Sequence, residues 1–524
     1  MPLIARIPTR YARTVAALTV FLAALLLPLS FTGGVITTSA IQHALGGTPA
    51  ALSWLTNGFM LTFGSFLLSA GVAADAIGRK RIFITGAALF CLSNVMICLT
   101  QNILLSGLLR SLQGLAAAMI LAGGSAALAR LYDGDDRTRA FSVLGTVFGA
   151  GLAFGPLMMG FITDALGWRW VYVLFALLSA IIMLAGIVFL PASEKSASQK
   201  VDSTGLTLFT VALMLFTSAI MLVPALGFLS LTALALFISS MLLFSGFLAR
   251  CLRVQNPILD ITLLRRPRFV GVLLLPVATC YCYVVLLIII PLHFMGGDGL
   301  NEAQSAFYLM ALTSPMLIFP SVAALLTRWF SPGTVSAAGL IISSVGLLFL
   351  GHALQSSSQL LVFSLILTGA GAALPWGLMD GLAISAVPVE KAGMAAGLFN
   401  TVRVAGEGIA LAMVSAFLTE VNDLNLRKTV YGHAPAVIHR AAAWLGGGNT
   451  EQAAALLPGV SSALLRESYD TAYTILFGIL AAVTLVCALM VWSMLGRKDA
   501  GYPVSKNALR EERIKPFSDK NGRS

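Results

Sequence analysis

The chain has 524 residues and a formal net charge of +11; 58% of its residues are hydrophobic, only 10% are charged, and its mean hydropathy is +0.90. A water-soluble domain carries about 25% charged residues, so this composition excludes a soluble globular protein and indicates an integral membrane protein. A hydrocarbon core needs roughly 20 apolar residues per helix, and runs of that length follow one another. A membrane β-barrel would instead show segments of about 10 residues with alternating polarity.

The first apolar run begins near Val15, behind Arg6, Arg10 and Arg13, and could be mistaken for a signal peptide. It stays uncharged as far as Gln42, which is too long for the apolar part of a signal sequence. We therefore interpret it as the first of about 14 membrane-spanning helices, whose ends are uncertain by about 2–4 residues. The spans are predicted at 15–42, 52–74, 82–100, 104–129, 140–163, 169–190, 204–224, 226–248, 269–293, 304–327, 333–353, 359–387, 393–418 and 471–495.

The distribution of Lys and Arg predicts the orientation of these spans. With the N-terminus inside, 26 of the 33 basic residues lie in segments on the cytoplasmic side, as the positive-inside rule requires. Only Arg110 and Arg403 fall within spans. The net positive charge is spread over the inner loops and the C-terminal tail, so we expect the anionic inner leaflet, and no nucleic acid, as its partner. Both termini are predicted to be cytoplasmic.

An internal repeat with an offset of 257 residues predicts two related halves. The segment GLAA at 114–117 recurs as GAAL at 371–374, and GAGL at 149–152 recurs as GEGI at 406–409. Two six-helix halves of this kind form a rocker-type transporter with its site near the membrane midplane, although small residues are frequent in any membrane helix. The predicted parts are an N-terminal bundle at 1–190, an inserted hairpin with linkers at 191–268, a C-terminal bundle at 269–495 with an outer loop at 420–470, and a cytoplasmic tail at 496–524.

The segment GVAADAIGRKR at 71–81 connects the second and third spans. Gly71 and Gly78 permit a close approach and a tight turn, while Asp75 at a helix end can pair with a basic residue or a helix N-terminus of the neighbouring bundle. Together with Arg79 they are predicted to form a conformational gate that sets the inward and outward populations. The basic residues alone would be ordinary anchoring. The segment resembles the inner-loop signature GxxxDxxGRRR of the major facilitator superfamily.

The fourth span contains RSLQGLAAA at 110–118, which resembles the RxxQGxxxA motif of the same superfamily. A guanidinium inside a span costs several kcal/mol unless it faces partners or water. Arg110 is therefore predicted to be a fixed cation that links proton and substrate movements. The alternative is that its side chain reaches out to the membrane interface.

The fifth span contains GAGLAFGPLMMG at 149–160, which resembles the antiporter signature GxxxGPxxGG. Gly151, Gly155 and Gly160 would line close helix contacts, and Pro156 would bend the helix. The family resemblance implies that this bend seals the cavity against leak. Ordinary small-residue packing is the alternative.

Three signatures in order, with about 14 spans, look like the 14-helix drug:proton antiporter family of the QacA/EmrB type. The resemblance implies an all-α major facilitator fold with two six-helix bundles and an inserted two-helix hairpin, in the inner (cytoplasmic) membrane. We expect a monomer whose partners are protons, a small-molecule substrate and the lipid bilayer. A periplasmic adaptor protein is a further partner that the sequence neither requires nor excludes.

One departure from the family concerns the proton site. The family usually carries an Asp early in the first helix, where this chain has Ser30. Glu407 near the middle of the thirteenth span supplies another carboxylate, and Arg403 lies one helical turn away on the same face. We predict that Glu407 binds the proton, with Asp380 as the second candidate. The alternative is a static pair of Arg403 and Glu407 that only fixes helix packing.

The sequence indicates the cargo only in outline. The predicted function is proton-coupled antiport of amphipathic or aromatic molecules, that is, multidrug efflux that confers antibiotic resistance. The runner-up is a dedicated exporter of one metabolite, such as a siderophore or antibiotic. No metal, cofactor or enzymatic activity is expected, because the five histidines lack ligand spacing. The predicted cavity residues are Trp54, Asn57, Phe63, Gln113, Tyr281, Tyr283, Trp376 and Asn400.

Overall fold

The computed structural model describes residues 9–132, 134–191, 202–227, 230–254, 259–354, 358–387 and 392–496. Throughout these ranges the secondary structure is helical, without a strand. Helices satisfy their own backbone N–H and C=O groups, as a chain in lipid must. Fourteen helical segments are long and apolar enough to cross a membrane, which confirms the predicted number of spans. Apart from Gly496, the predicted cytoplasmic tail lies outside the described residues.

The first six spans form one half of the molecule. The first span begins and ends earlier than predicted, because the helix runs from Thr9 to Ile36 and a separate short helix follows Thr37. Gly33 and Gly34 weaken the helix here, and the Thr37 hydroxyl hydrogen-bonds to the Gly33 carbonyl at 2.8 Å. The elements of this N-terminal half are α1 (Thr9–Ile36), α2 (Thr38–Leu45), α3 (Pro49–Ile77), α4 (Arg79–Leu99), α5 (Ile103–Leu131), α6 (Gly134–Leu166) and α7 (Trp168–Phe189).

The last six spans form the other half, and two of them are interrupted. A π-helical segment breaks the first, and a 3₁₀ turn at Pro315 breaks the second. Proline lacks a backbone N–H and clashes with the preceding turn, which accounts for the second break. The elements of this C-terminal half are α11 (Pro267–Thr279), η2 (Cys280–Val284), α12 (Leu286–Gly297), α13 (Glu302–Thr313), η3 (Ser314–Leu317), α14 (Phe319–Leu326), α15 (Pro332–Ala353), α16 (Ser358–Ser385), α17 (Ala392–Thr429) and α20 (Ser462–Leu495).

A helical hairpin lies between the halves in the sequence. It consists of α8 (Ser203–Leu226) and α9 (Leu231–Arg253), and the short α10 (Ile261–Leu264) follows. The Ser240 hydroxyl of α9 donates to the Ala212 carbonyl of α8 at 2.8 Å. Helix α8 also packs against α3 of one half and α17 of the other, so the hairpin covers the seam between the halves.

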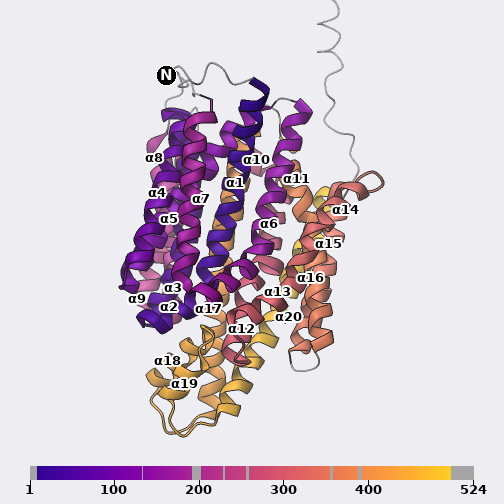
Figure 1. Cartoon of the computed structure of the whole chain (residues 1–524). Coiled ribbons are helices and arrows are strands. Elements are labelled where there is room, and N and C mark those ends of the chain that lie inside the picture. The colour runs from indigo at the N-terminus through magenta and orange to yellow at the C-terminus, as the bar shows by residue number, and fades with distance from the viewer. Residues whose placement is uncertain are drawn as a thin grey trace, which may run out of the picture.

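Two short helices, α18 (Pro435–Gly446) and α19 (Thr450–Leu456), cap one end of the bundle. Figure 1 shows them at the end opposite to the start of α1; we call these the cap end and the terminal end. The cap is fastened to α12, because the Thr450 hydroxyl donates to the Gly296 carbonyl at 2.6 Å. Gly296 lies so close to Gly448 that a side chain there would overlap its carbonyl oxygen.

The two halves contact each other along two helix pairs, α3 with α17 and α6 with α13. The internal repeat relates these pairs, because it matches α3 to α13 and α6 to α17. Glycine makes the first contact close: a Cβ on Gly64 of α3 would lie 2.6 Å from the Cα of Ala405 of α17. Helix α6 also packs on α16, and the site described next lies at that contact.

Candidate functional site

A buried arginine connects the two halves. Arg403 of α17 is 4% exposed, and its Nη1 donates to both carboxylate oxygens of Asp380 on α16, at 3.2 and 3.4 Å. Its Nη2 donates to the Asn400 side-chain oxygen at 2.7 Å. The guanidinium also covers the ring of Phe148 from α6, with Cζ 4.9 Å from the ring centroid. Arg403 therefore contacts both halves at once.

Glu407 lies one turn further along α17 and is 1% exposed. Neither of its carboxylate oxygens has a hydrogen-bond partner in the described part of the chain. The pair between Arg403 and Glu407 considered from the sequence is not made here, because Arg403 turns to Asp380 on the neighbouring helix. Burying an ionised carboxylate without a partner is costly, so the neutral acid fits this conformation.

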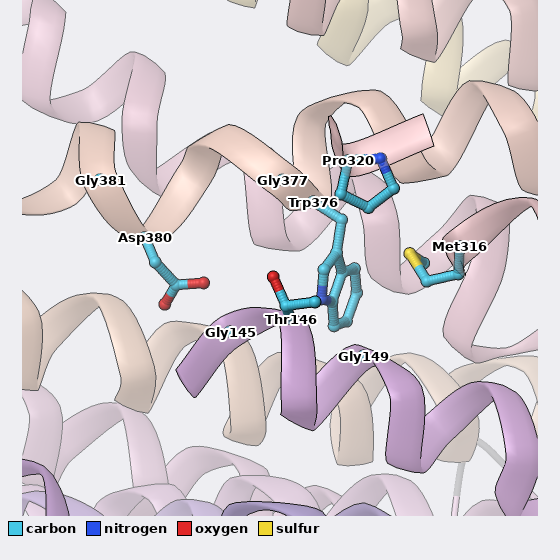
Figure 2. A pocket seen from close by; sticks show the side chains of 9 residues that line it. All are labelled: Gly145, Thr146, Gly149, Met316, Pro320, Trp376, Gly377, Asp380 and Gly381. Atoms are coloured by element: carbon cyan, nitrogen blue, oxygen red, sulfur yellow. The ribbon is translucent and has the colours of Figure 1, made fainter. Parts of the chain in front are cut away.

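A small pocket lies beside this ion pair, between α6, α16 and the η3–α14 segment. Figure 2 shows Trp376 and Asp380 projecting from α16 toward α6. The indole Nε1 of Trp376 is buried without a hydrogen-bond partner. A Cβ on Gly145 would lie 2.7 Å from Oδ2 of Asp380, so the carboxylate reaches the opposite half. The lining residues are Gly145, Thr146, Gly149, Met316, Pro320, Trp376, Gly377, Asp380 and Gly381.

A second buried arginine, Arg110 of α5, lies within the N-terminal half. It is fully buried, which contradicts the alternative that it reaches the membrane interface. Its Nε donates to the Leu55 carbonyl at 3.2 Å, and its Nη1 donates to both oxygens of Ser30 at 3.3 Å and to the side-chain oxygen of Gln113. Its guanidinium lies over the ring of Phe59, with Cζ 4.7 Å from the centroid.

The partners of Arg110 are all neutral. Gln113 in turn donates a hydrogen bond to the side-chain oxygen of Asn94 at 2.7 Å. Nη2 of Arg110 has no hydrogen-bond partner among the described residues. That nitrogen points at α1, where a Cβ on Gly34 would lie 2.1 Å from it. Ser30, which stands where the resembled family has an Asp, therefore supplies hydrogen-bond acceptors and no countercharge.

The gate segment between α3 and α4 is held within its own half. Asp75 accepts hydrogen bonds from Nε and Nη2 of Arg79 at 3.2 and 3.0 Å, and Nη1 of Arg79 donates to the Ala126 carbonyl of α5 at 3.1 Å. Gly78 joins the helices with φ of +118°, a conformation that favours glycine. Gly71 has no neighbour close enough to contact an added side chain. The expected contact of Asp75 with the neighbouring bundle is thus replaced by an ion pair one turn along the chain.

The antiporter-type segment on α6 packs against α1. A Cβ on Gly151 would lie 2.5 Å from Cγ of Pro28, and one on Gly155 would lie 2.1 Å from the Thr32 hydroxyl oxygen. Gly160 is buried, and the helix continues through Pro156. The glycines therefore serve close packing inside the N-terminal half.

Of the eight predicted cavity residues, Trp376 lines the pocket. Tyr283 is next to it, with ring centroids 6.0 Å apart and a buried, unpartnered hydroxyl. Asn400 and Gln113 instead hydrogen-bond to the two arginines. The remaining four are not pocket-lining: Trp54, Asn57, Phe63 and Tyr281.

The sequence indicated close helix contacts at Gly145 and Gly149, but not that these glycines line the pocket. Gly145 precedes the antiporter-type segment and Gly149 begins it, and Thr146 occupies the position that the 257-residue repeat matches to Arg403. That match was the available signal. Among the described residues, no group of three His, Cys, Asp or Glu side chains is arranged to hold a metal ion.

Comparison with known proteins places this geometry in context. Residues 15–411 match the family model described as Major Facilitator Superfamily. The chain is 25% identical to the tetracenomycin C resistance and export protein of Streptomyces glaucescens over 464 residues, covering 86% of each chain. It is 25% identical to the multidrug resistance protein Stp of Mycobacterium tuberculosis over 380 residues, covering 72% of this chain and 71% of Stp.

Solved structures show the same fold. A peptide transporter POT in complex with sulfate superposes with a TM-score of 0.59 at 13% identity, covering 94% of this chain and 99% of the transporter. At that identity the likeness concerns the fold alone. The predicted all-α major facilitator architecture is confirmed by this match together with the family model.

Proposed function

Because the chain belongs to the major facilitator superfamily, we propose that it exports small organic molecules across the membrane in exchange for protons. Relatives at about a quarter identity carry names of export and resistance proteins, among them the probable actinorhodin transporter of Streptomyces coelicolor, at 26% identity over 431 residues. Export is the function that agrees best with the names of these relatives. A pocket between two helical halves also agrees with a transporter that opens alternately to each side of the membrane.

The single observation that carries the proposal is the cluster of Asp380, Arg403 and Glu407 beside the pocket. It combines a buried ion pair with a buried acid that has no partner, and it touches α6 through Phe148. Separating α6 from α16 would expose the pocket and change the surroundings of the cluster. Transport by alternating access therefore couples naturally to proton binding at Glu407, with Asp380 as the second acid.

The pocket favours aromatic or amphipathic cargo, because the Trp376 indole and the Met316 thioether line it. Multidrug efflux follows if such surfaces accept many shapes. The second candidate is dedicated export of one metabolite, such as a siderophore or antibiotic. A narrow substrate profile in the assay below would favour that second candidate.

The proposed setting is the inner (cytoplasmic) membrane, with both chain termini in the cytoplasm and the α18–α19 cap outside. The placement of 26 of the 33 basic residues on one side supports this orientation. We propose a monomer without enzymatic activity, which leaves room for a periplasmic adaptor at the cap.

The test is proton flux in everted membrane vesicles that contain the protein and a pH-sensitive dye. Respiration acidifies the lumen, and aromatic compounds including proflavine are added in turn. We expect substrates to dissipate the proton gradient in wild-type vesicles and to have no such effect in Glu407→Gln vesicles, because the amide carries no titratable proton.

Glu451→Gln is the matched control, since it makes the same chemical change at an exposed position of α19. It should behave like the wild type. A library in which no compound dissipates the gradient would contradict export by proton exchange. Full coupling in Glu407→Gln would contradict the assignment of the proton to this residue.

A further inference from the structure

We infer that His293 is a pH-sensitive latch: its protonated ring holds α12 against Asp470 of α20 when the medium at the cap end is acidic, and the hold weakens when that medium becomes alkaline. The latch is separate from the cluster of Asp380, Arg403 and Glu407, and it requires neither a cargo nor a proton gradient. Its position on the outer face of the membrane rests on the proposed orientation.

Helix α12 is a segment set off from the helix before it. The π-helical η2 interrupts the span directly before α12, and such interruptions are frequent at functional sites. Within α12, Pro291 has no N–H to donate to the preceding turn. Helix α12 packs against α1 of the N-terminal half, so a shift of α12 changes a contact between the halves.

The far end of α12 is fastened to α20 and lies next to the cap (Figure 1). Two tyrosine hydroxyls of α20 donate to carbonyls of α12 at 3.2 Å, Tyr469 to Leu292 and Tyr473 to Ile289. These bonds do not depend on charge. His293 adds a contact that does, because an imidazole gains its charge between about pH 8 and pH 5.

The charges around His293 leave a place for one proton. Nε2 of His293 lies 3.1 Å from Oδ1 of Asp470. Arg466 pairs with Asp470 and also with Asp298, which directly follows α12. Two acids and one arginine have a net charge of −1, and an imidazolium at His293 brings the sum to zero. The buried ring would then form a charge-assisted hydrogen bond with the acid.

The surroundings of the ring also favour its charged form. The ring of Tyr469 is stacked on the imidazole with centroids 5.2 Å apart, and aromatic faces attract cations within about 6 Å. Water reaches the cluster from the cap end, because the side chains of Arg466 and Asp298 are 51% and 33% exposed. His293 therefore exchanges protons with the medium beside the cap.

A second histidine of the cap end has similar neighbours and a different charge balance. Nδ1 of His439 on α18 lies 3.6 Å from Oδ1 of Asp423 on α17, beyond hydrogen-bond distance. Asp423 is already neutralised by Nε of Arg427 at 2.6 Å. A proton on His439 would give these three residues a net charge of +1, so His439 serves as the control for His293.

Other charged residues on the elements packed against α12 do not oppose the latch. Arg10 and Arg13 of α1 lie at the terminal end. Glu451 of α19 and Glu467 of α20 are exposed, so water screens them. Glu302 begins α13, and its charge has the same sign as that of Asp298. The tyrosines and cysteines of η2, α13 and α20 are of residue types that are uncharged between about pH 5 and pH 8.

Hydrogen–deuterium exchange of the purified full-length protein, followed by mass spectrometry, tests the latch. Exchange rates are corrected for the intrinsic dependence of amide exchange on pH. The amides of α12 should then exchange roughly tenfold more slowly at about pH 5 than at about pH 8, because a hydrogen bond to an imidazolium is stronger than one to a neutral ring. Helix α4 of the N-terminal half should show no such difference.

Three variants locate the effect. His293→Gln keeps an N–H for Asp470 but cannot become charged, so α12 should exchange at the fast rate at both pH values. Asp470→Asn should also abolish the difference. His439→Gln makes the same chemical change at the cap end and should retain it.

Equal corrected exchange of α12 at both pH values in the wild type overturns the latch, and this comparison needs no variant to fold. A pH dependence that persists in His293→Gln, or that disappears in His439→Gln, overturns it as well. The exchange measurement uses no cargo, so its failure leaves proton-coupled export standing. Absence of all compound-dependent proton flux in vesicles removes the export proposal, whatever the exchange of α12.

Discussion

The two arginines that are buried in the described part of the chain are held in opposite ways. Arg110 is enclosed within one half by carbonyl, hydroxyl and amide groups, none of which carries a charge. Arg403 is bound to a carboxylate, lies one turn from a second acid and stacks on a ring of the other half. The first arrangement has no titratable group to exchange, whereas the second has two.

This difference separates a fixed cation from a movable one. The neutral partners of Arg110 come from α1, α3 and α5, so its hydrogen bonds tie three helices of one half together. The partners of Arg403 come from α16, α17 and α6, so its contacts cross a boundary that transport must open. We therefore propose that proton coupling takes place at Arg403, and that Arg110, which the sequence also suggested for coupling, holds its half together.

The largest effect is expected from Arg403→Leu. It leaves Asp380 mostly buried without a cation, which costs about 3–5 kcal/mol in such settings. Thermal unfolding of purified protein should report the loss, and proton-coupled transport should vanish. The double variant Arg403→Leu/Asp380→Leu should recover part of the stability without transport. If Arg403→Leu alone were as stable as the wild type, the claim that Arg403 neutralises a buried acid, unlike Arg110, would be contradicted.

Arg110→Lys should have the next largest effect. A single ammonium group cannot reproduce the bonds to the Leu55 carbonyl, Ser30 and Gln113, so we expect a loss of about 1–3 kcal/mol of stability. The number of protons exchanged per substrate should stay as in the wild type. An altered proton stoichiometry in vesicles would show that Arg110 belongs to the coupling machinery after all.

Ser30→Asp sharpens the comparison by giving Arg110 a countercharge. The serine hydroxyl lies 3.3 Å from Nη1 of Arg110, so an ionised carboxylate there should stabilise the protein by about 1–2 kcal/mol. Ser30→Asn has a side chain of nearly the same size without the charge. Thermal unfolding of the two variants at neutral pH isolates the charge, and equal stabilities would contradict the description of Arg110 as uncompensated.

The smallest effect concerns an ion pair between Asp202, which precedes α8, and Arg250 in the last turn of α9. Asp202 accepts hydrogen bonds from Nε of Arg250 at 2.7 Å and from the Gly205 amide at 3.0 Å. Burial alone would raise the pKa of Asp202, but these two donors hold it below its ordinary value.

A lowered pKa in the folded state means that the stabilisation is present above the unfolded pKa, about 3.9, and is lost as the pH falls through the folded value. Arg250 is partly exposed, so we expect less than about 1 kcal/mol. Denaturant unfolding of wild type and Asp202→Asn should differ at neutral pH and converge on acidification. A constant difference across that range would exclude the pair as its cause.

Much of the architecture could be predicted from the sequence because lipid imposes simple rules. Span number followed from apolar run length, and the Arg110 and Glu407 positions stood out because charges in spans are rare. The end of α1 at Ile36 was not predictable from hydropathy, since the apolar run continues to Gln42. There the local conformation of Gly33, Gly34 and Thr37 decides the boundary.

The partners inside the site could not be predicted from spacing along one helix. Arg403 and Glu407 have the separation of an ion pair, yet Asp380 on another helix takes the arginine. For Asp75 the expected partner lay in the neighbouring bundle, but the observed partner is Arg79, one helical turn further along the chain. Tertiary packing decides among partners of similar chemistry, and a single sequence does not contain those distances.

The most direct measurement is proton release upon ligand binding by purified protein in unbuffered detergent solution. Proflavine is added, and a pH indicator records the protons that leave the protein. We predict that the wild type releases protons in proportion to bound ligand, and that Glu407→Gln binds proflavine but releases none. Equal release from both proteins would contradict the central claim that Glu407 holds the exchanged proton.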